Sequence, residues 1–129
     1  RVLFRSGAVR RCCAVLAVRP LADHPQLLST SRHVTQGLVD VLSEQWEEPS
    51  LRLTGVSRVV GGDPYEMRFL TRSTVGGWKL AGVQVGESDA AAGVQASLGA
   101  AETGLARATL RSGASREVRW NATFVRQDR

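Results

Sequence analysis

The second half of the chain repeats one pattern, in which apolar and polar residues alternate over short segments that end at turn residues. The clearest example is residues 117–124 (EVRWNATF), and the pattern recurs at residues 65–69, 94–98 and 106–111. Successive side chains of a strand point to opposite faces, so each segment predicts a strand with one buried face and one wet face. This alternation favours antiparallel sheets around a single dry interior.

Three other segments extend this prediction. Residues 78–85 (WKLAGVQV) change phase at Ala81-Gly82, which predicts a β-bulge. Residues 9–18 (VRRCCAVLAV) form a nearly continuous apolar run, typical of a strand buried on both faces. Residues 38–46 fit a helix or a strand, and the preceding Gly37 with the β-branched valines favours a strand.

The segments between the strands carry turn chemistry. Pro20 precedes residues 21–37, which contain Pro25, a Ser-Thr-Ser cluster and Gly37, so we expect an irregular stretch there. Residues 61–64 (GGDP) predict a tight turn that joins residues 51–60 and 65–69 as a β-hairpin. Residues 87–93 (ESDAAAG) predict one helical turn, with Ser88 or Asp89 as its N-cap.

About eight short strands with turns every eight to twelve residues predict an all-β fold. We expect an antiparallel β-sandwich with immunoglobulin-like or similar Greek-key topology. At 129 residues the chain has the length of one domain, which we place at residues 7–129.

The first six residues (RVLFRS) belong to none of these patterns. One choice of codons for them reproduces the end of a common short-read sequencing adapter. We therefore interpret residues 1–6 as a translated artefact, with a disordered basic arm as the alternative. The artefact would make the chain a fragment, from metagenomic DNA, of a protein that continues upstream.

Charge and cysteine usage narrow the function classes. The net charge is +5, but 16 of the 17 basic residues are arginines scattered singly along the strands among acidic residues. A phosphate-binding surface needs its basic groups on one face, so we expect no nucleic-acid partner. No apolar run is long enough to predict a membrane span. Cys12 and Cys13 are adjacent, which favours two free thiols over a disulfide or a metal site.

Nucleophilic catalysis has only weak candidates. His24 and His33 flank the irregular segment, Asp23 precedes the first, and Ser29 or Ser31 would have to act as nucleophile. No nucleophile-elbow pattern surrounds these serines, so we expect their hydroxyls to bond the backbone instead.

Carboxylates and aromatic residues suggest carbohydrate chemistry. Glu44, Glu47 and Glu48 surround Trp46 close to a turn, which is more typical of a solvated strand end than of an acid/base pair. Trp78 and Trp120 lie on apolar phases and are predicted core residues. Trp46 is therefore the candidate carbohydrate-binding residue, as an exposed stacking platform. We predict no catalytic residue, no metal site and no cofactor.

Three stretches resemble a known family: "VRPLADHPQLLSTSRHVTQG", "GVSRVVGGDPYEMRF" and "SREVRWNATF". They are similar to the C-terminal β-sandwich of secreted bacterial glycoside hydrolases of the alpha-galactosidase type, some of which are labelled "enterotoxin". The resemblance covers about residues 9–124. In such enzymes the catalytic carboxylates lie on a preceding (β/α)8 barrel, so no catalytic role transfers to a residue of this chain.

The resemblance implies a non-catalytic accessory module whose partner is an upstream catalytic barrel of the same chain. It also implies a secreted or periplasmic protein, whose export signal would lie outside these residues. Two alternatives remain open, because β-sandwiches host many functions. One is an independent carbohydrate-binding module that uses Trp46, and the other is a protein-interaction sandwich.

Overall fold

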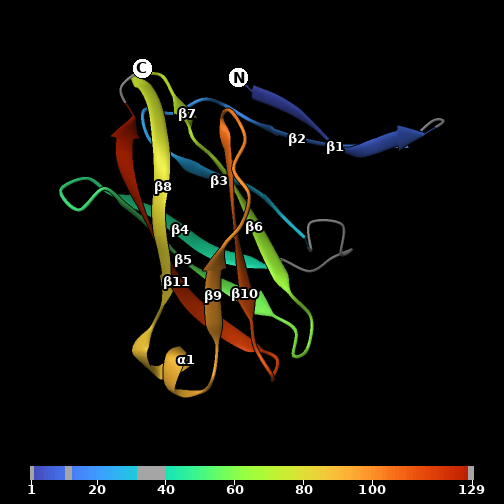
Figure 1. The fold of residues 1–129 in the computed structure, drawn as a ribbon, viewed down its shortest axis with the longest axis vertical. Helices are drawn as coiled ribbons and strands as arrows, with labels where there is room; N and C mark the ends of the chain where they lie inside the picture. Colours follow the sequence, from blue (N-terminus) through green and yellow to red (C-terminus); the bar gives the residue numbers. More distant parts are fainter. Residues whose placement is uncertain (1, 11–12, 32–39, 128–129) are drawn as a thin grey trace.

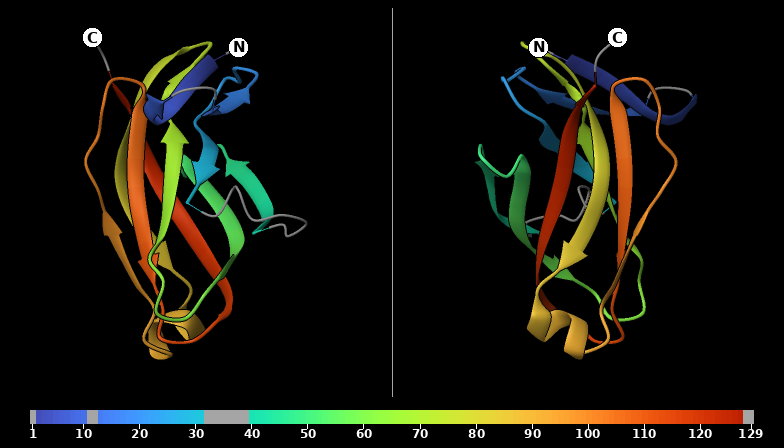
Figure 2. Two further views of the ribbon diagram at one scale, coloured as in Figure 1. Left: turned by 90° about the vertical axis from the view of Figure 1, so that its right-hand side faces the viewer. Right: turned by 60° about the vertical axis from the view of Figure 1, so that its left-hand side comes forward.

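The computed structural model describes residues 2–10, 13–31 and 40–127, with side chains described in 20–31 and 40–127. It is all-β, with nine antiparallel strands in two sheets and one short helix. The two sheets face each other as a β-sandwich, and one of them is curled into a half-barrel (Figures 1 and 2). The predicted antiparallel β-sandwich is thus confirmed.

Each main sheet combines strands from distant parts of the sequence. The four-stranded sheet has the order β3 (Gln26–Thr30), β6 (Tyr65–Leu70), β10 (Leu105–Arg111), β9 (Gln95–Leu98). The five-stranded sheet has the order β4 (Val41–Glu47), β5 (Arg52–Val59), β11 (Arg116–Gln127), β8 (Gly76–Val85), β7 (Arg72–Ser73). β1 (Val2–Arg10) and β2 (Cys13–Arg19) pair as a separate hairpin, and α1 (Glu87–Ala91) links β8 to β9.

The predicted hairpin between residues 51–60 and 65–69 is wrong. β5 pairs with β4 and β11, whereas β6 pairs with β3 and β10 in the other sheet. Residues 61–64 therefore carry the chain from one sheet to the other. The Tyr65 hydroxyl lies 3.1 Å from Ser57 Oγ, within hydrogen-bonding distance, so β5 and β6 face each other across the interior.

Three smaller expectations also need correction. The apolar run 9–18 is not one strand, because β1 ends at Arg10 and β2 begins at Cys13. Residues 21–37 are not wholly irregular, since β3 lies within them. The N-cap of α1 is Gly86, not Ser88 or Asp89. Cys12, His33 and residues 34–39 lie outside the described residues, as do the side chains of the apolar run.

The predicted bulge in β8 is confirmed. Thr123 of β11 pairs with Gly82 of β8, but the next residue, Phe124, pairs with Leu80. Ala81 is the extra residue, so the alternation of β8 shifts by one residue there and its apolar side chains stay on the inner face. This shift keeps Trp78 and Leu80 buried above the bulge, while Val83 and Val85 pack against the core below it.

The core consists of the inward residues of both sheets, as the alternation predicts. Phe69 of β6 contacts Trp120 and Phe124 of β11 in edge-to-face arrangements, with ring centroids 5.7 and 5.8 Å apart. A fully buried side chain of this size stabilises the fold by about 1.5–3 kcal/mol. Trp78 and Trp120 are both buried, which confirms them as core residues.

A chain of hydrogen bonds crosses the core beside these rings. Trp120 Nε1 donates to Ser57 Oγ at 2.9 Å, and the Tyr65 hydroxyl lies within bonding distance of both Ser57 Oγ and, at 2.7 Å, Asp40 Oδ2. Thr30 also donates to Asp40 Oδ2, at 2.5 Å. Burial, followed by the Asp40 carboxylate, raises the pKa of Tyr65 well above the ordinary tyrosine value, although the Ser57 hydrogen bond opposes the shift.

The raised pKa of Tyr65 predicts alkaline destabilisation. The folded state keeps the phenol proton above pH 10, where an unfolded tyrosine loses it, so stability from this group is complete below pH 10 and falls above it. The expected slope approaches about 1.4 kcal/mol per pH unit. Tyr65 is the only tyrosine in the chain, so absorbance at 295 nm reports its ionisation directly. Phenolate appearing near pH 10 in the folded protein would contradict the shift, and Tyr65→Phe should remove the slope.

Candidate functional site

A groove lies at the side of the sandwich where the two sheets remain open. It has a volume of about 850 Å³ and lies between β8 and the segment that runs from the end of β9 into β10. β7 pairs only with Gly76 and Gly77 of β8, so the rest of that edge of β8 has no strand partner among the described residues. β9 likewise forms the edge of its own sheet. Figure 1 shows the two edges beside each other.

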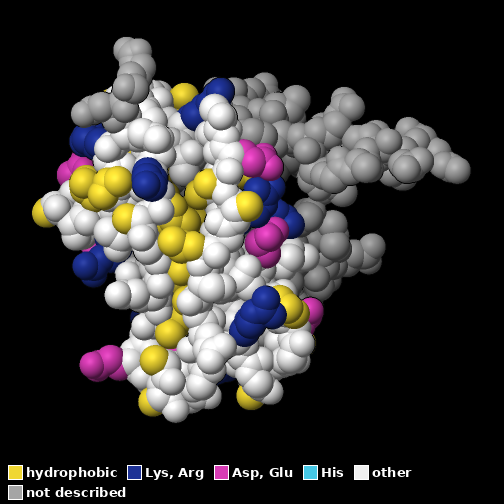
Figure 3. Space-filling model, viewed as in Figure 1, with side chains coloured by type: hydrophobic (Ala, Val, Ile, Leu, Met, Phe, Trp, Pro, Cys, Tyr) yellow, Lys and Arg dark blue, Asp and Glu magenta, His cyan; other side chains and the backbone are white. Residues whose placement is uncertain are grey.

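The floor of the groove is the edge of the hydrophobic core. Trp78 and Leu80 contribute from β8, and Leu105 and Ala106 contribute from β10, all of them buried. Leu98 stands on the opposite wall with half of its surface exposed. Figure 3 shows apolar side chains following the line between β8 and the β9–β10 hairpin. A ligand in the groove would therefore contact apolar surface along its length.

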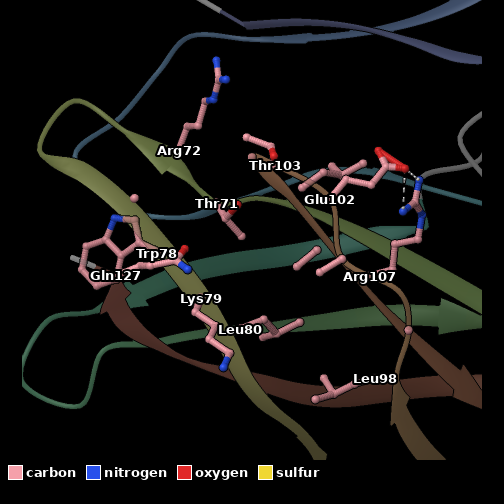
Figure 4. Close-up of a pocket in the computed structure, with 16 residues that line it drawn as sticks. Thr71, Arg72, Trp78, Lys79, Leu80, Leu98, Glu102, Thr103, Arg107 and Gln127 are labelled. Carbon is pink, nitrogen blue, oxygen red and sulfur yellow. Dashed lines mark hydrogen bonds and ion pairs between the residues drawn. The ribbon is translucent and has the colours of Figure 1, made fainter. Parts of the chain in front are cut away.

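Charged side chains surround this apolar floor (Figure 4). Arg107 and Glu102 face each other across the β9–β10 connection, with an Arg107 Nη2 to Glu102 Oε2 distance of 3.4 Å. Arg72 and Lys79 are exposed and have no ion-pair partner within residues 20–31 and 40–127. The groove therefore contains three cations and one carboxylate, Glu102, among its described lining residues.

Local structure fixes several of these groups. Gly104 has a φ of +81°, which favours glycine, and a Cβ there would lie 2.9 Å from Arg72 Nε and would displace the end of that side chain. Trp78 Nε1 donates to Ser73 Oγ at 2.9 Å, while the Arg126 guanidinium carbon lies 4.8 Å from the indole centroid. These two contacts hold the Trp78 indole in a fixed orientation in the floor of the groove.

The sequence-predicted residue Trp46 does not line this groove. It is half-buried behind Trp78, with ring centroids 5.4 Å apart in an edge-to-face arrangement. The His24 ring stacks on Trp46 at 5.3 Å, nearly parallel to it, and Trp46 Nε1 donates to Glu48 at 3.3 Å. His24 thus occupies part of the aromatic surface that a sugar would use, so Trp46 as a stacking platform stays a prediction.

The other sequence candidates lie apart from the groove. Asp23 lies 4.0 Å from His24, and the Ser31 hydroxyl accepts a hydrogen bond from Glu66 N–H. Glu44 accepts from the Leu27 backbone N–H, which ties β4 to β3. Ser31 and Glu44 thus serve contacts between strands in the described structure.

The sequence offered little signal for the groove. Its residues come from β7, β8, the β9–β10 hairpin with its connection, and the end of β11, and no motif or spacing connects them. The one usable sign is that the only lysine of the chain, Lys79, directly follows Trp78 at the opening of an apolar strand. The predicted strands placed each residue on a face but did not say which strand edges would be left open.

The described residues contain no cluster of three or more His, Cys, Asp or Glu side chains that could hold a metal ion. Within the same residues, no helix has the length and hydropathy needed to cross a membrane.

The fold and groove define a β-sandwich with one open, cation-rimmed side. A scan against known protein families gave no match, and searches of curated proteins and of solved structures also gave none.

Proposed function

We propose that this chain is the non-catalytic β-sandwich module of a secreted glycoside hydrolase of the alpha-galactosidase type. In this role it packs against the catalytic barrel of the same polypeptide and stabilises it. The observation that carries the proposal is the architecture. Two antiparallel sheets around one core are the fold that the resemblance of residues 9–124 implies.

The use of the carboxylates supports a non-catalytic role. Glycoside hydrolysis usually requires two carboxyl groups about 5–10 Å apart across a substrate cleft. In the groove, Glu102 is the single carboxylate among the described lining residues, and Arg107 holds it. Asp40, Glu44 and Asp89 accept hydrogen bonds that join elements of the fold. These hydrogen bonds give the three carboxylates a structural role.

One observation favours a second candidate, carbohydrate binding by the sandwich alone. Four neighbouring strands place uncharged hydrogen-bonding side chains in one cross-strand row on the outer face of the five-stranded sheet: Gln45, Thr54, Asn121 and Gln84. Three of them line a shallow hollow of about 320 Å³. Amide and hydroxyl groups both donate and accept hydrogen bonds, as sugar hydroxyls do.

Three tests separate these functions. For an accessory module we expect no release of nitrophenol from nitrophenyl α-galactoside by the purified chain, and no heat on titration with galactosyl oligosaccharides. The reading frame upstream in the source DNA should encode a barrel with paired carboxylates. Hydrolysis by the isolated chain, or an upstream frame without a barrel, would overturn the proposal. Oligosaccharide binding that Asn121→Ala abolishes and Arg52→Ala leaves intact would establish the second candidate instead.

A further inference from the structure

We propose that the groove between β8 and the β9–β10 connection binds a small organic anion with an apolar body, such as an aromatic carboxylate or sulfonate. This site goes beyond the accessory role proposed above and does not depend on it. The outer-face hollow with its uncharged row is a separate surface on the five-stranded sheet.

The size and lining of the groove fit such a ligand. Small-molecule sites typically have volumes of about 300–1,000 Å³ and are mainly apolar, with a few polar groups that orient the ligand. The groove has about 850 Å³, a floor of core side chains and an exposed leucine, Leu98, on its far wall. An apolar body would cover Leu98 and the small exposed parts of the floor side chains and remove them from water.

The charge of the groove selects an anion. Glu102 neutralises Arg107, which leaves Arg72 and Lys79 as cations without an ion-pair partner in the described part of the chain. Both extend from the β7–β8 side of the groove (Figure 4). A carboxylate or sulfonate beside either cation would form charge-assisted hydrogen bonds, which are stronger than neutral ones. A cationic ligand would meet a net repulsion at the same place.

The edge of β8 argues for a small molecule over an added peptide strand. Natural proteins protect open strand edges with bulges and with lysines. β8 has both, because Ala81 forms the bulge and Lys79 lies two residues before it. A regular ladder between β8 and an incoming strand would be interrupted at Ala81. The open side therefore remains a groove and is poorly suited to strand addition.

The test compares three naphthalene probes that differ in charge: naphthalene-1-sulfonate, naphthalene-1-methanol and 1-naphthylmethylammonium. Chemical shifts in ¹⁵N-labelled protein report affinity and position, and the indole N–H of Trp78 and the amides of Gly99 and Gly104 mark the groove. We expect the sulfonate to bind at least about tenfold more tightly than the ammonium, and to shift these signals first. Equal affinity for the two ions, or shifts confined to other surfaces, would overturn the proposal.

Matched charge reversals give a second readout. Lys79→Glu and Arg72→Glu should each weaken sulfonate binding about tenfold, since the reversal replaces an attraction to the anion with a repulsion. Arg52→Glu makes the same change of charge on exposed β5 and should alter affinity less than twofold. All three side chains are exposed, so the variants should fold, which circular dichroism checks. Equal losses of affinity in all three variants would mean that the net charge of the protein alone explains the effect, which would contradict a site in the groove.

Discussion

Gly55→Ala is expected to lower the free energy of unfolding by about 3 kcal/mol, the upper end of the usual cost of overpacking a core. Gly55 pairs with Trp120 in the middle of the five-stranded sheet. An added methyl group would overlap the indole ring and would lie 2.7 Å from the Ser43 carbonyl oxygen. Trp120 cannot easily move away, because it is buried and its Nε1 donates to Ser57. Urea denaturation followed by tryptophan fluorescence measures the loss.

Gly82→Ala is the matched control for this prediction. Gly82 lies in the same sheet, and a Cβ there would meet nothing within 4 Å. We expect a change within about 0.5 kcal/mol, the usual range of surface substitutions. If both alanine variants lost the same stability, the cost would come from the strand backbone, and the proposed fit of Trp120 over Gly55 would be wrong.

Asp89→Ala is expected to cost about 3 kcal/mol, because it breaks a buried, charge-assisted contact and leaves its partners unpaired. Asp89 is only 2% exposed. One carboxylate oxygen lies 3.0 Å from Arg116 Nη2, and the other accepts the Arg119 backbone N–H at 3.0 Å. These contacts attach α1 to the first residues of β11. Arg116 Nε is already buried and has no hydrogen-bond partner among residues 2–10, 13–31 and 40–127, so loss of the carboxylate would isolate the guanidinium further.

Two further variants sharpen this experiment. Asp89→Asn keeps an acceptor for the Arg119 N–H and removes the charge, so it should recover about half of the loss. Glu87→Ala removes an exposed carboxylate from the same short helix and should change stability by less than about 0.5 kcal/mol. Thermal unfolding of the set gives the order. A loss for Glu87→Ala as large as that for Asp89→Ala would mean that negative charge in the first turn of α1, not the buried contact, carries the effect.

The alternation along each segment was sufficient to predict the sandwich and most of its strands. Residues 117–124 and 65–69 bury the predicted side chains, and the phase change at Ala81-Gly82 appears as a bulge. These predictions succeed because the side-chain period of a strand is local, so that a few residues determine which face is buried.

The local alternation of side chains could not predict which strands pair with each other. The turn residues 61–64 are equally compatible with a hairpin and with a crossing between two sheets. What places β5 opposite β6 is contact across the interior, where Ser57 meets both Tyr65 and Trp120. The strand β3 was missed for a related reason, since its pairing with β6 overrides the turn-forming composition around it.

The groove shows the same limit for function. The sequence named Trp46 as the residue for a ligand, but the structure places His24 against its ring and leaves the open space on the far side of Trp78. Arg72, Lys79 and Arg107 line one groove only because two sheet edges lie beside each other. No local pattern encodes that meeting.

By itself, the sequence determined that this chain forms strands, which face of most strands is dry, and where β8 changes phase, because these properties depend on neighbouring residues. The tertiary structure alone decided which strands pair, that residues 61–64 cross between the sheets, and that one side of the sandwich stays open with a charged rim. Those outcomes depend on packing between residues far apart in the chain, whose contacts have no local sequence signature.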